Sequence, residues 1–203
     1  VDTATEVQKK NVQYDTGMSL LSGKYHLKFV VRENQTGRMG SFEADIEVPD
    51  LKTQPLKMSS VVLASQRTPI KMKNSPDPLD RDGVEWVPNV AHVFRQDQHL
   101  YLLYELYDPA KDKGAAGLAG GPAASPGLNR RDSGPVRVLT SMELLSGGVK
   151  VYETPLVTAR TLNDPQRNAV AFQFDVPLTQ LKPGTYVCQI NVIDDAGGSC
   201  IFP

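Results

Sequence analysis

The sequence PLTQLKPGTYVCQINVIDDAGGSCIFP, at Pro177–Pro203, decides the fold. It contains a short apolar segment, a Pro-Gly bend, a tyrosine that begins an alternating strand, and an Asp-Asp-Ala-Gly-Gly reversal before a return strand. This order predicts the closing hairpin of an antiparallel β-sandwich. The same order occurs at Ser19–Pro49, where Leu-x-Gly-x-Tyr precedes an alternating strand, a glycine-containing turn and a second strand. The sequence therefore predicts one structural plan used twice.

Two domains are predicted around these hairpins. The first, residues 1–52, is expected to hold the C-terminal strands of a partial immunoglobulin-like β-sandwich, or strands that dock on the second domain. The second, residues 53–203, is expected to be an immunoglobulin-like or fibronectin-III-like sandwich, since about seven strand patterns follow one another there. The chain begins at Val1 without a methionine, and we interpret it as a piece of a longer polypeptide.

The strands are predicted from their alternation of apolar and polar residues. They are expected at 25–31, 42–48, 59–64, 86–94, 99–107, 136–145, 149–154 and 168–176, with one weaker strand within 5–20. The segment at 99–107, HLYLLYELY, is the most apolar and should be central, paired with 86–94 as a hairpin. A Ser-Gly-Gly turn should join 136–145 to 149–154. A helical turn at 177–181 should carry the chain from one sheet to the other.

A long segment at 109–135 interrupts this pattern. Most of its residues are Ala, Gly or Pro, and it has neither periodicity nor aromatic residues. Such a composition buries too little apolar surface to offset the entropy of ordering the backbone. We predict that this insertion is disordered; a loop that orders on a partner is the alternative.

Composition argues against several functions. The chain has 22 Lys and Arg against 23 Asp and Glu, a net charge of −1, which gives no electrostatic basis for nucleic-acid binding. No apolar run approaches the roughly 20 residues of a membrane-spanning helix, so membrane insertion is not expected. No small-molecule ligand and no cofactor are expected either.

Three carboxylate motifs are candidate metal sites. Asp15-Thr-Gly-Met-Ser19 has the outline of a metal-dependent adhesion motif, but glycine replaces one hydroxyl ligand. Asp80 and Asp82 match two positions of a calcium loop whose first and last ligands are missing. The pair at 194–195 lies in a glycine-rich turn, where carboxylates usually accept hydrogen bonds from backbone amides. No metal site is therefore predicted.

No catalytic constellation is predicted. His92 and His99 flank the expected hairpin and could share a face of the sheet, but no carboxylate is spaced to orient either ring. Cys188 lies in an apolar strand, which does not favour an activated thiolate. We interpret the histidines, including His26, as surface residues of strands.

The two cysteines, Cys188 and Cys200, both lie in the closing hairpin. A turn centred near Asp194 would place them opposite each other and allow a cross-strand disulfide, whereas a centre near Ala196 would misalign them. Two free, partly buried thiols are the alternative.

Four aromatic residues offer a ligand platform. Trp86, Tyr101, Tyr104 and Tyr107 could stack against sugars if they were exposed together. Residues of this kind more often form the core between two sheets.

Several long phrases of the sequence resemble a known family. They are GKYHLKFVVRENQTGRMGSFEADIEVP at 23–49, SSVVLASQR at 59–67, and the segments at 87–94, 99–109, 149–156 and 176–203. Together they resemble the C-terminal region of the VWFA-related proteins of Acidobacteria. The resemblance implies an extracytoplasmic location and a parent protein with an N-terminal von Willebrand factor A-type domain. That domain is not in this sequence, so no functional residue is carried over.

These observations favour a non-enzymatic, extracytoplasmic β-sandwich module. It would give structural support or protein–protein contacts within a larger VWFA-related, adhesion-type protein, with a protein partner or the remainder of the parent polypeptide bound to it. The alternative is a carbohydrate-binding module that uses the aromatic residues around Trp86.

Overall fold

The computed structural model describes residues 16–54, 56–70, 79–112 and 135–202. The chain divides into two compact units, Val1–Leu51 and Lys52–Pro203, which are described separately below. Strands make up 55% of the structure and helices 4%, and every strand pairing is antiparallel, so the fold is all-β. Within the described ranges, no helix is long and apolar enough to cross a membrane.

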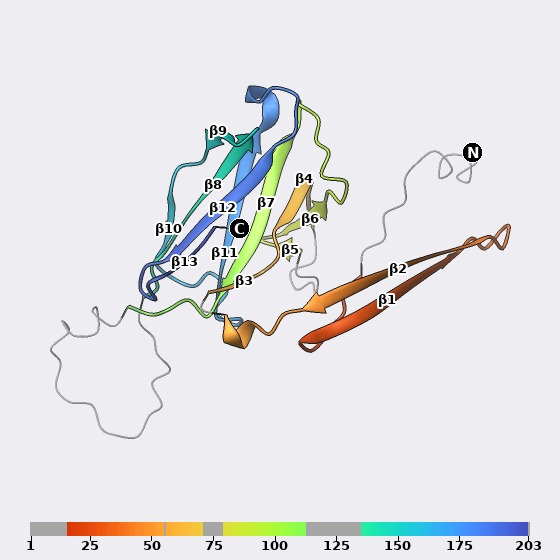
Figure 1. Cartoon of the computed structure of the whole chain (residues 1–203), viewed down its shortest axis with the longest axis horizontal. Coiled ribbons are helices and arrows are strands. Elements are labelled where there is room, and N and C mark those ends of the chain that lie inside the picture. The colour runs from red at the N-terminus through yellow and green to blue at the C-terminus, as the bar shows by residue number, and fades with distance from the viewer. Residues whose placement is uncertain (1–15, 55, 71–78, 113–134, 203) are drawn as a thin grey trace, which may run out of the picture. The chain divides into compact units, whose positions relative to one another are not determined.

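The larger unit is built from two antiparallel sheets (Figure 1). The six-stranded sheet contains, in spatial order, β11 (Ala169–Pro177), β7 (His99–Tyr107), β4 (Val62–Pro69), β6 (Val84–Pro88) and β5 (Asp80–Arg81), with β3 (Lys57–Met58) paired to β7. The five-stranded sheet contains β10 (Val157–Ala159), β8 (Val138–Ser146), β12 (Val187–Asp194) and β13 (Ser199–Ile201), with β9 (Val149–Glu153) paired to β8.

Alternate residues of these strands form the core between the sheets. On β7 the side chains of Leu102, Tyr104 and Leu106 are at most 1% exposed, and on β12 the same is true of Val192. The remaining buried members come from both sheets: Leu100, Val138, Met142, Leu144, Val170, Phe172, Phe174, Val176 and Ile190. The alternation of period two places one side chain in two in this layer, which is why the strands are apolar on one face.

Several predicted features are confirmed. The strand β7 is central, because it pairs with β11 on one side and with β4 and β3 on the other. The turn between β8 and β9 has positive φ at Gly147 (57°) and Gly148 (81°), which glycine adopts without steric cost. A short 3-10 helix, η3 (Leu178–Gln180), follows Pro177 and carries the chain from β11 in one sheet to β12 in the other.

The predicted hairpin between 86–94 and 99–107 is wrong. The strand β6 ends at Pro88, and it pairs with β4 and β5, whereas β4 lies between β6 and β7. Residues 89–98 form a loop in which Asn89 Nδ2 donates to the Val93 carbonyl at 2.8 Å and His92 adopts a positive φ of 52°. His92 and His99 therefore do not share a face of a hairpin.

A tyrosine hydroxyl secures the entrance to the closing hairpin. Tyr186 Oη donates to the carbonyl of Lys182 at 2.5 Å, and the bend at Gly184 lets the ring fold back over the chain. The strand β12 then runs to a turn in which Asp194 pairs with Ser199. The closing hairpin is thus present as the sequence predicts, and of the two turn centres that the sequence left open the structure has the one near Ala196.

The smaller unit contains a second hairpin of the same type. The strands β1 (Gly23–Arg32) and β2 (Met39–Val48) form a ten-residue antiparallel ladder, and the 3-10 helix η1 (Leu51–Thr53) follows. Tyr25 Oη donates to the carbonyl of Leu21 at 2.7 Å, four residues back, as Tyr186 does to Lys182. Both hairpins therefore begin at the same type of tyrosine corner.

Two predictions fall on residues outside the described ranges. They are the weak strand within 5–20, which the structure describes only from Thr16, and the disorder expected at 109–135, where 113–134 are not described. At the base of that insertion Lys111 forms a bridge with Val136, and the Asp112 amide donates to the Pro135 carbonyl at 2.8 Å.

Candidate functional site

The four aromatic residues around Trp86 that could have formed a ligand platform are not exposed together. Trp86 and Tyr104 are each 1% exposed, while Tyr101 and Tyr107 are half-buried. Tyr104 points into the core between the sheets, where its ring lies 5.5 Å from Phe172. Trp86 lies in a separate apolar cluster with Ala64 and Leu103, where Tyr101 contacts it edge-on and the Arg67 guanidinium lies 5.6 Å from its ring. The four residues therefore pack the two faces of one sheet and offer no shared stacking surface.

A second buried group in the six-stranded sheet is the carboxylate of Glu105 on β7. Glu105 is 5% exposed and accepts hydrogen bonds from Arg167 Nη1 at 3.0 Å and from Tyr107 Oη at 2.5 Å, and it is also paired with Arg81. A buried carboxylate needs such partners to offset its desolvation. The cluster therefore holds β5, β7 and the segment before β11 together, and its carboxylate oxygens are already occupied.

The two cysteines do not form the cross-strand disulfide that one reading of the sequence allowed. Both are free. The register of the closing hairpin pairs Cys200 with Ile193, whereas Cys188 pairs with Leu144 on β8. Because the turn is centred near Ala196 rather than Asp194, the two thiols are displaced along the hairpin by several residues.

Two of the acidic residues considered as metal ligands, Asp82 and Asp194, instead accept hydrogen bonds from other parts of the fold. Asp82 Oδ2 accepts a hydrogen bond from Gln173 Nε2 at 3.0 Å, and Asp80 lies in β5 opposite Glu85. Asp194 is 3% exposed and accepts from the amides of Ala110 at 2.8 Å and Gly197 at 3.2 Å. In the part of the chain that the structure describes, no group of three His, Cys, Asp or Glu residues is arranged to hold a metal ion.

The histidines have carboxylate partners that sequence spacing did not reveal. His99 Nδ1 lies 2.5 Å from Asp175 Oδ1, because β7 and β11 are neighbours in the sheet. His26 Nδ1 lies 2.7 Å from Asp45 Oδ1 on the adjacent strand of the hairpin. Each partner is distant in sequence, so only the strand register could have identified it.

The β1–β2 hairpin has one apolar face and one face that carries ion pairs, together with the exposed side chains of Val30 and Met39. On the charged face Lys28 lies 2.5 Å from Glu43, His26 contacts both Glu43 and Asp45, and Lys24 lies 3.8 Å from Glu47. Hydrogen bonds from Lys28 and His26 lower the pKa of Glu43 below its ordinary value. This face is suited to water.

The opposite face, which we call the hairpin face, consists of Tyr25, Leu27, Phe29, Val31, Phe42, Ala44, Ile46 and Val48. Phe29 and Phe42 lie directly opposite each other, with ring centroids 6.4 Å apart. Phe29 is 42% exposed, Phe42 65% and Val31 71%. Neither buried core cluster of the described residues includes a side chain from this face.

The closing hairpin provides an internal comparison. Counted from the tyrosine of each corner, Phe29 corresponds to Ile190, and Val31 corresponds to Val192. Ile190 is 2% exposed and Val192 is 0% exposed, because the six-stranded sheet covers them. The same element is thus covered by a sheet in one unit, whereas in the other its outer half is open to solvent.

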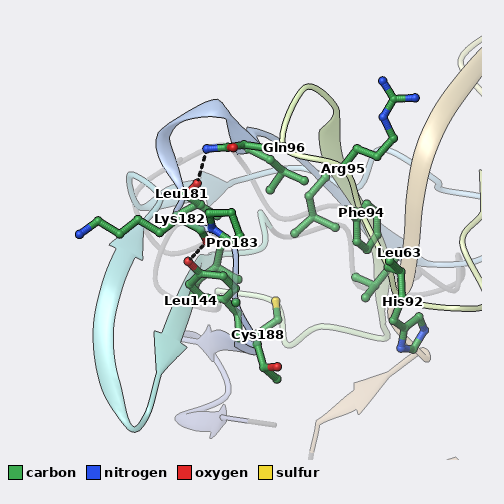
Figure 2. Close-up of a pocket in the computed structure, with 16 residues that line it drawn as sticks. Leu63, His92, Phe94, Arg95, Gln96, Leu144, Leu181, Lys182, Pro183 and Cys188 are labelled. Carbon is green, nitrogen blue, oxygen red and sulfur yellow. Dashed lines mark hydrogen bonds between the residues drawn. The ribbon is translucent and has the colours of Figure 1, made fainter.

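A cavity of about 630 Å³ opens at one end of the sandwich, where β7 and β12 begin. Figure 2 shows Leu63, Phe94 and Arg95 on one side of this end cavity, facing Leu144 and Cys188 on the other. Burial raises the pKa of the Cys188 thiol to about 11, which disfavours a nucleophilic thiolate.

Comparison of the chain with family models, with curated proteins and with solved structures found no match. Function is therefore inferred from the hairpin face and the end cavity.

Proposed function

We propose that this chain is a non-enzymatic β-sandwich module whose hairpin face binds an apolar β-sheet surface of a protein partner. The observation that carries the proposal is the exposure of Phe29, Val31 and Phe42 on a hairpin whose other face is lined with ion pairs. Contiguous exposed apolar surface on one face of an element is typical of protein interaction sites.

A sheet is the occupant that the fold itself favours. The corresponding side chains of the closing hairpin, Ile190 and Val192, pack against the facing sheet within the larger unit. A two-stranded hairpin is marginally stable without such a cover. Full burial of each exposed Phe or Val side chain would contribute on the order of 1.5–3 kcal/mol before the cost of association. A partner sheet would therefore stabilise β1–β2 and bind at the same time.

We further propose an immunoglobulin-like or fibronectin-III-like type for the sandwich. The adjacent strands β4, β7 and β11 in one sheet and β8, β12 and β13 in the other have the A-B-E and C-F-G orders of that class. The tyrosine corners support the same assignment. The resemblance to VWFA-related proteins supports an extracytoplasmic location within a larger adhesion-type protein. In that setting the partner is a separate protein or another part of the parent polypeptide.

Site-specific photo-crosslinking tests the proposed function. Phe29 is replaced by p-benzoylphenylalanine in cells that produce the protein, and the matched control carries the same residue in place of Lys28 on the charged face. We expect irradiation to give a discrete protein adduct from position 29 and none from position 28. Mass spectrometry should locate the cross-link in an apolar strand of the captured protein.

Two outcomes would contradict the proposal. Equal adducts from both positions would show that capture does not depend on the apolar face, and a lipid adduct from position 29 would show that the face contacts a membrane. A second copy of this chain in the adduct would identify the partner as the protein itself.

A further inference from the structure

The end cavity has the size and position of a ligand site. Its volume of about 630 Å³ lies within the range of roughly 300–1,000 Å³ that is typical of small-molecule pockets. The loop at 89–98 and the segment between η3 and β12 border it, so the cavity lies where the inter-sheet core meets solvent. The side chain of Gln96 spans these two segments by donating to the Leu181 carbonyl at 2.9 Å (Figure 2).

The interior of the cavity is apolar. Its walls are Leu63, Val93, Phe94, Leu100, Leu144, Leu178 and Leu181. Two polar side chains at its edge are already used, since Gln96 Nε2 donates to the Leu181 carbonyl and Tyr186 Oη donates to the Lys182 carbonyl, while Thr185 adds one hydroxyl to the lining. A ligand that filled the interior would find few hydrogen-bond partners there, so its buried portion must be apolar.

The two charged residues of the cavity lining, Arg95 and Lys182, are both cationic, and none of the described lining residues is acidic. Arg95 is held by Asp97, with Nε to Oδ1 at 2.9 Å, which reduces its availability. Lys182 is exposed and forms no ion pair with a described residue, and in Figure 2 its side chain points away from the other labelled lining residues. The flexible four-carbon stem of a lysine lets its ammonium group reach the mouth of such a cavity.

We propose that the end cavity binds a small amphipathic anion, with its apolar chain between the two sheets and its carboxylate at the mouth beside Lys182. This site is separate from the hairpin face, so it does not depend on the proposed function. It also differs from the expectation that no small molecule binds. The sequence could not show that the loop at 89–98 and the segment before β12 together enclose a cavity.

The two cysteines provide a direct assay. Cys188 lines the cavity, whereas Cys200 is exposed on β13 and does not. Alkylation by N-ethylmaleimide is followed at each thiol by mass spectrometry in the presence of dodecanoate, dodecanol or dodecyltrimethylammonium, all below their micelle concentrations. We expect dodecanoate to slow the alkylation of Cys188 saturably without affecting Cys200, and the cation to protect Cys188 least.

Variants test the role of the charge. Lys182→Met removes the charge but keeps most of the unbranched side chain, and it should raise the half-saturating concentration of dodecanoate by about two- to fivefold, as expected for an exposed charge pair. The control, Lys150→Met, removes a lysine from β9 that does not line the cavity, and it should leave the value unchanged. No protection of Cys188, equal protection by the three amphiphiles, or equal protection of Cys200 would overturn the proposal.

Discussion

Cys188 shows how one residue reports on its surroundings. The side chain lies on β12 at the edge of the core and lines the end cavity. Burial disfavours the charged thiolate and raises the pKa of this thiol from its ordinary value near 9 to about 11. The residue therefore behaves as a small apolar side chain at neutral pH, and its reactivity should depend steeply on pH.

We predict that Cys200 is alkylated first at pH 8 and that the rate at Cys188 rises about tenfold per pH unit up to about pH 11. Rates measured on the Cys200→Ser variant isolate Cys188. The raised pKa of Cys188 also makes the stability of the fold depend on pH. The unfolded chain loses this proton at lower pH than the folded one, so the contribution is present below pH 9 and is lost as the pH rises toward 11. A rate at Cys188 that levels off near pH 9 would contradict the assignment.

At the scale of elements, the tyrosine corner and the hairpin after it form a repeated unit. In each copy the tyrosine hydroxyl donates to a backbone carbonyl four residues earlier, and a glycine two residues before the tyrosine leaves space for its ring. The hydrogen bond fixes the direction in which the strand enters its sheet. Sequence pattern was sufficient to predict this element, because all the residues that form it are local.

Removing the Tyr186 hydroxyl should destabilise the larger unit. We expect Tyr186→Phe to lower the free energy of unfolding by about 0.5–1.5 kcal/mol, since the ring remains but the bond to the Lys182 carbonyl is lost. Urea denaturation measures the change. Tyr152→Phe is the matched control: that ring is also half-buried, and no hydrogen bond of its hydroxyl is found among the described residues. Equal destabilisation by both variants would argue against a special role for the corner.

At the scale of the whole molecule, local patterns predicted the faces of strands but not their neighbours. The alternation along HLYLLYELY correctly separated Leu102, Tyr104 and Leu106 from Glu105 and Tyr107. The pairing of β6 was missed because β4, from earlier in the chain, lies between β6 and β7. No local signal encodes such an insertion of one strand between two others.

The candidate sites also differ in whether local sequence patterns could predict them. The apolar hairpin face could be predicted from alternation, since Phe29 and Phe42 fall in phase with their neighbours. Burial of Trp86 was the favoured interpretation, but its place outside the inter-sheet core could not be predicted, because it depends on the packing of Arg67 and Tyr101 from two other strands. The end cavity was missed for a related reason: it arises where two loops distant in sequence meet.

Hydrogen–deuterium exchange most directly tests whether the hairpin face is uncovered in this chain. Peptides that span Tyr25–Val31 are compared with peptides that span the corresponding strand, Tyr186–Val192, in the same sample. Amides of a hairpin without a covering sheet open locally, whereas those of β12 open with the sandwich core. We predict that the first set exchanges at least about tenfold faster than the second. Equal protection of the two strands would show that the hairpin face is already covered and would contradict the account.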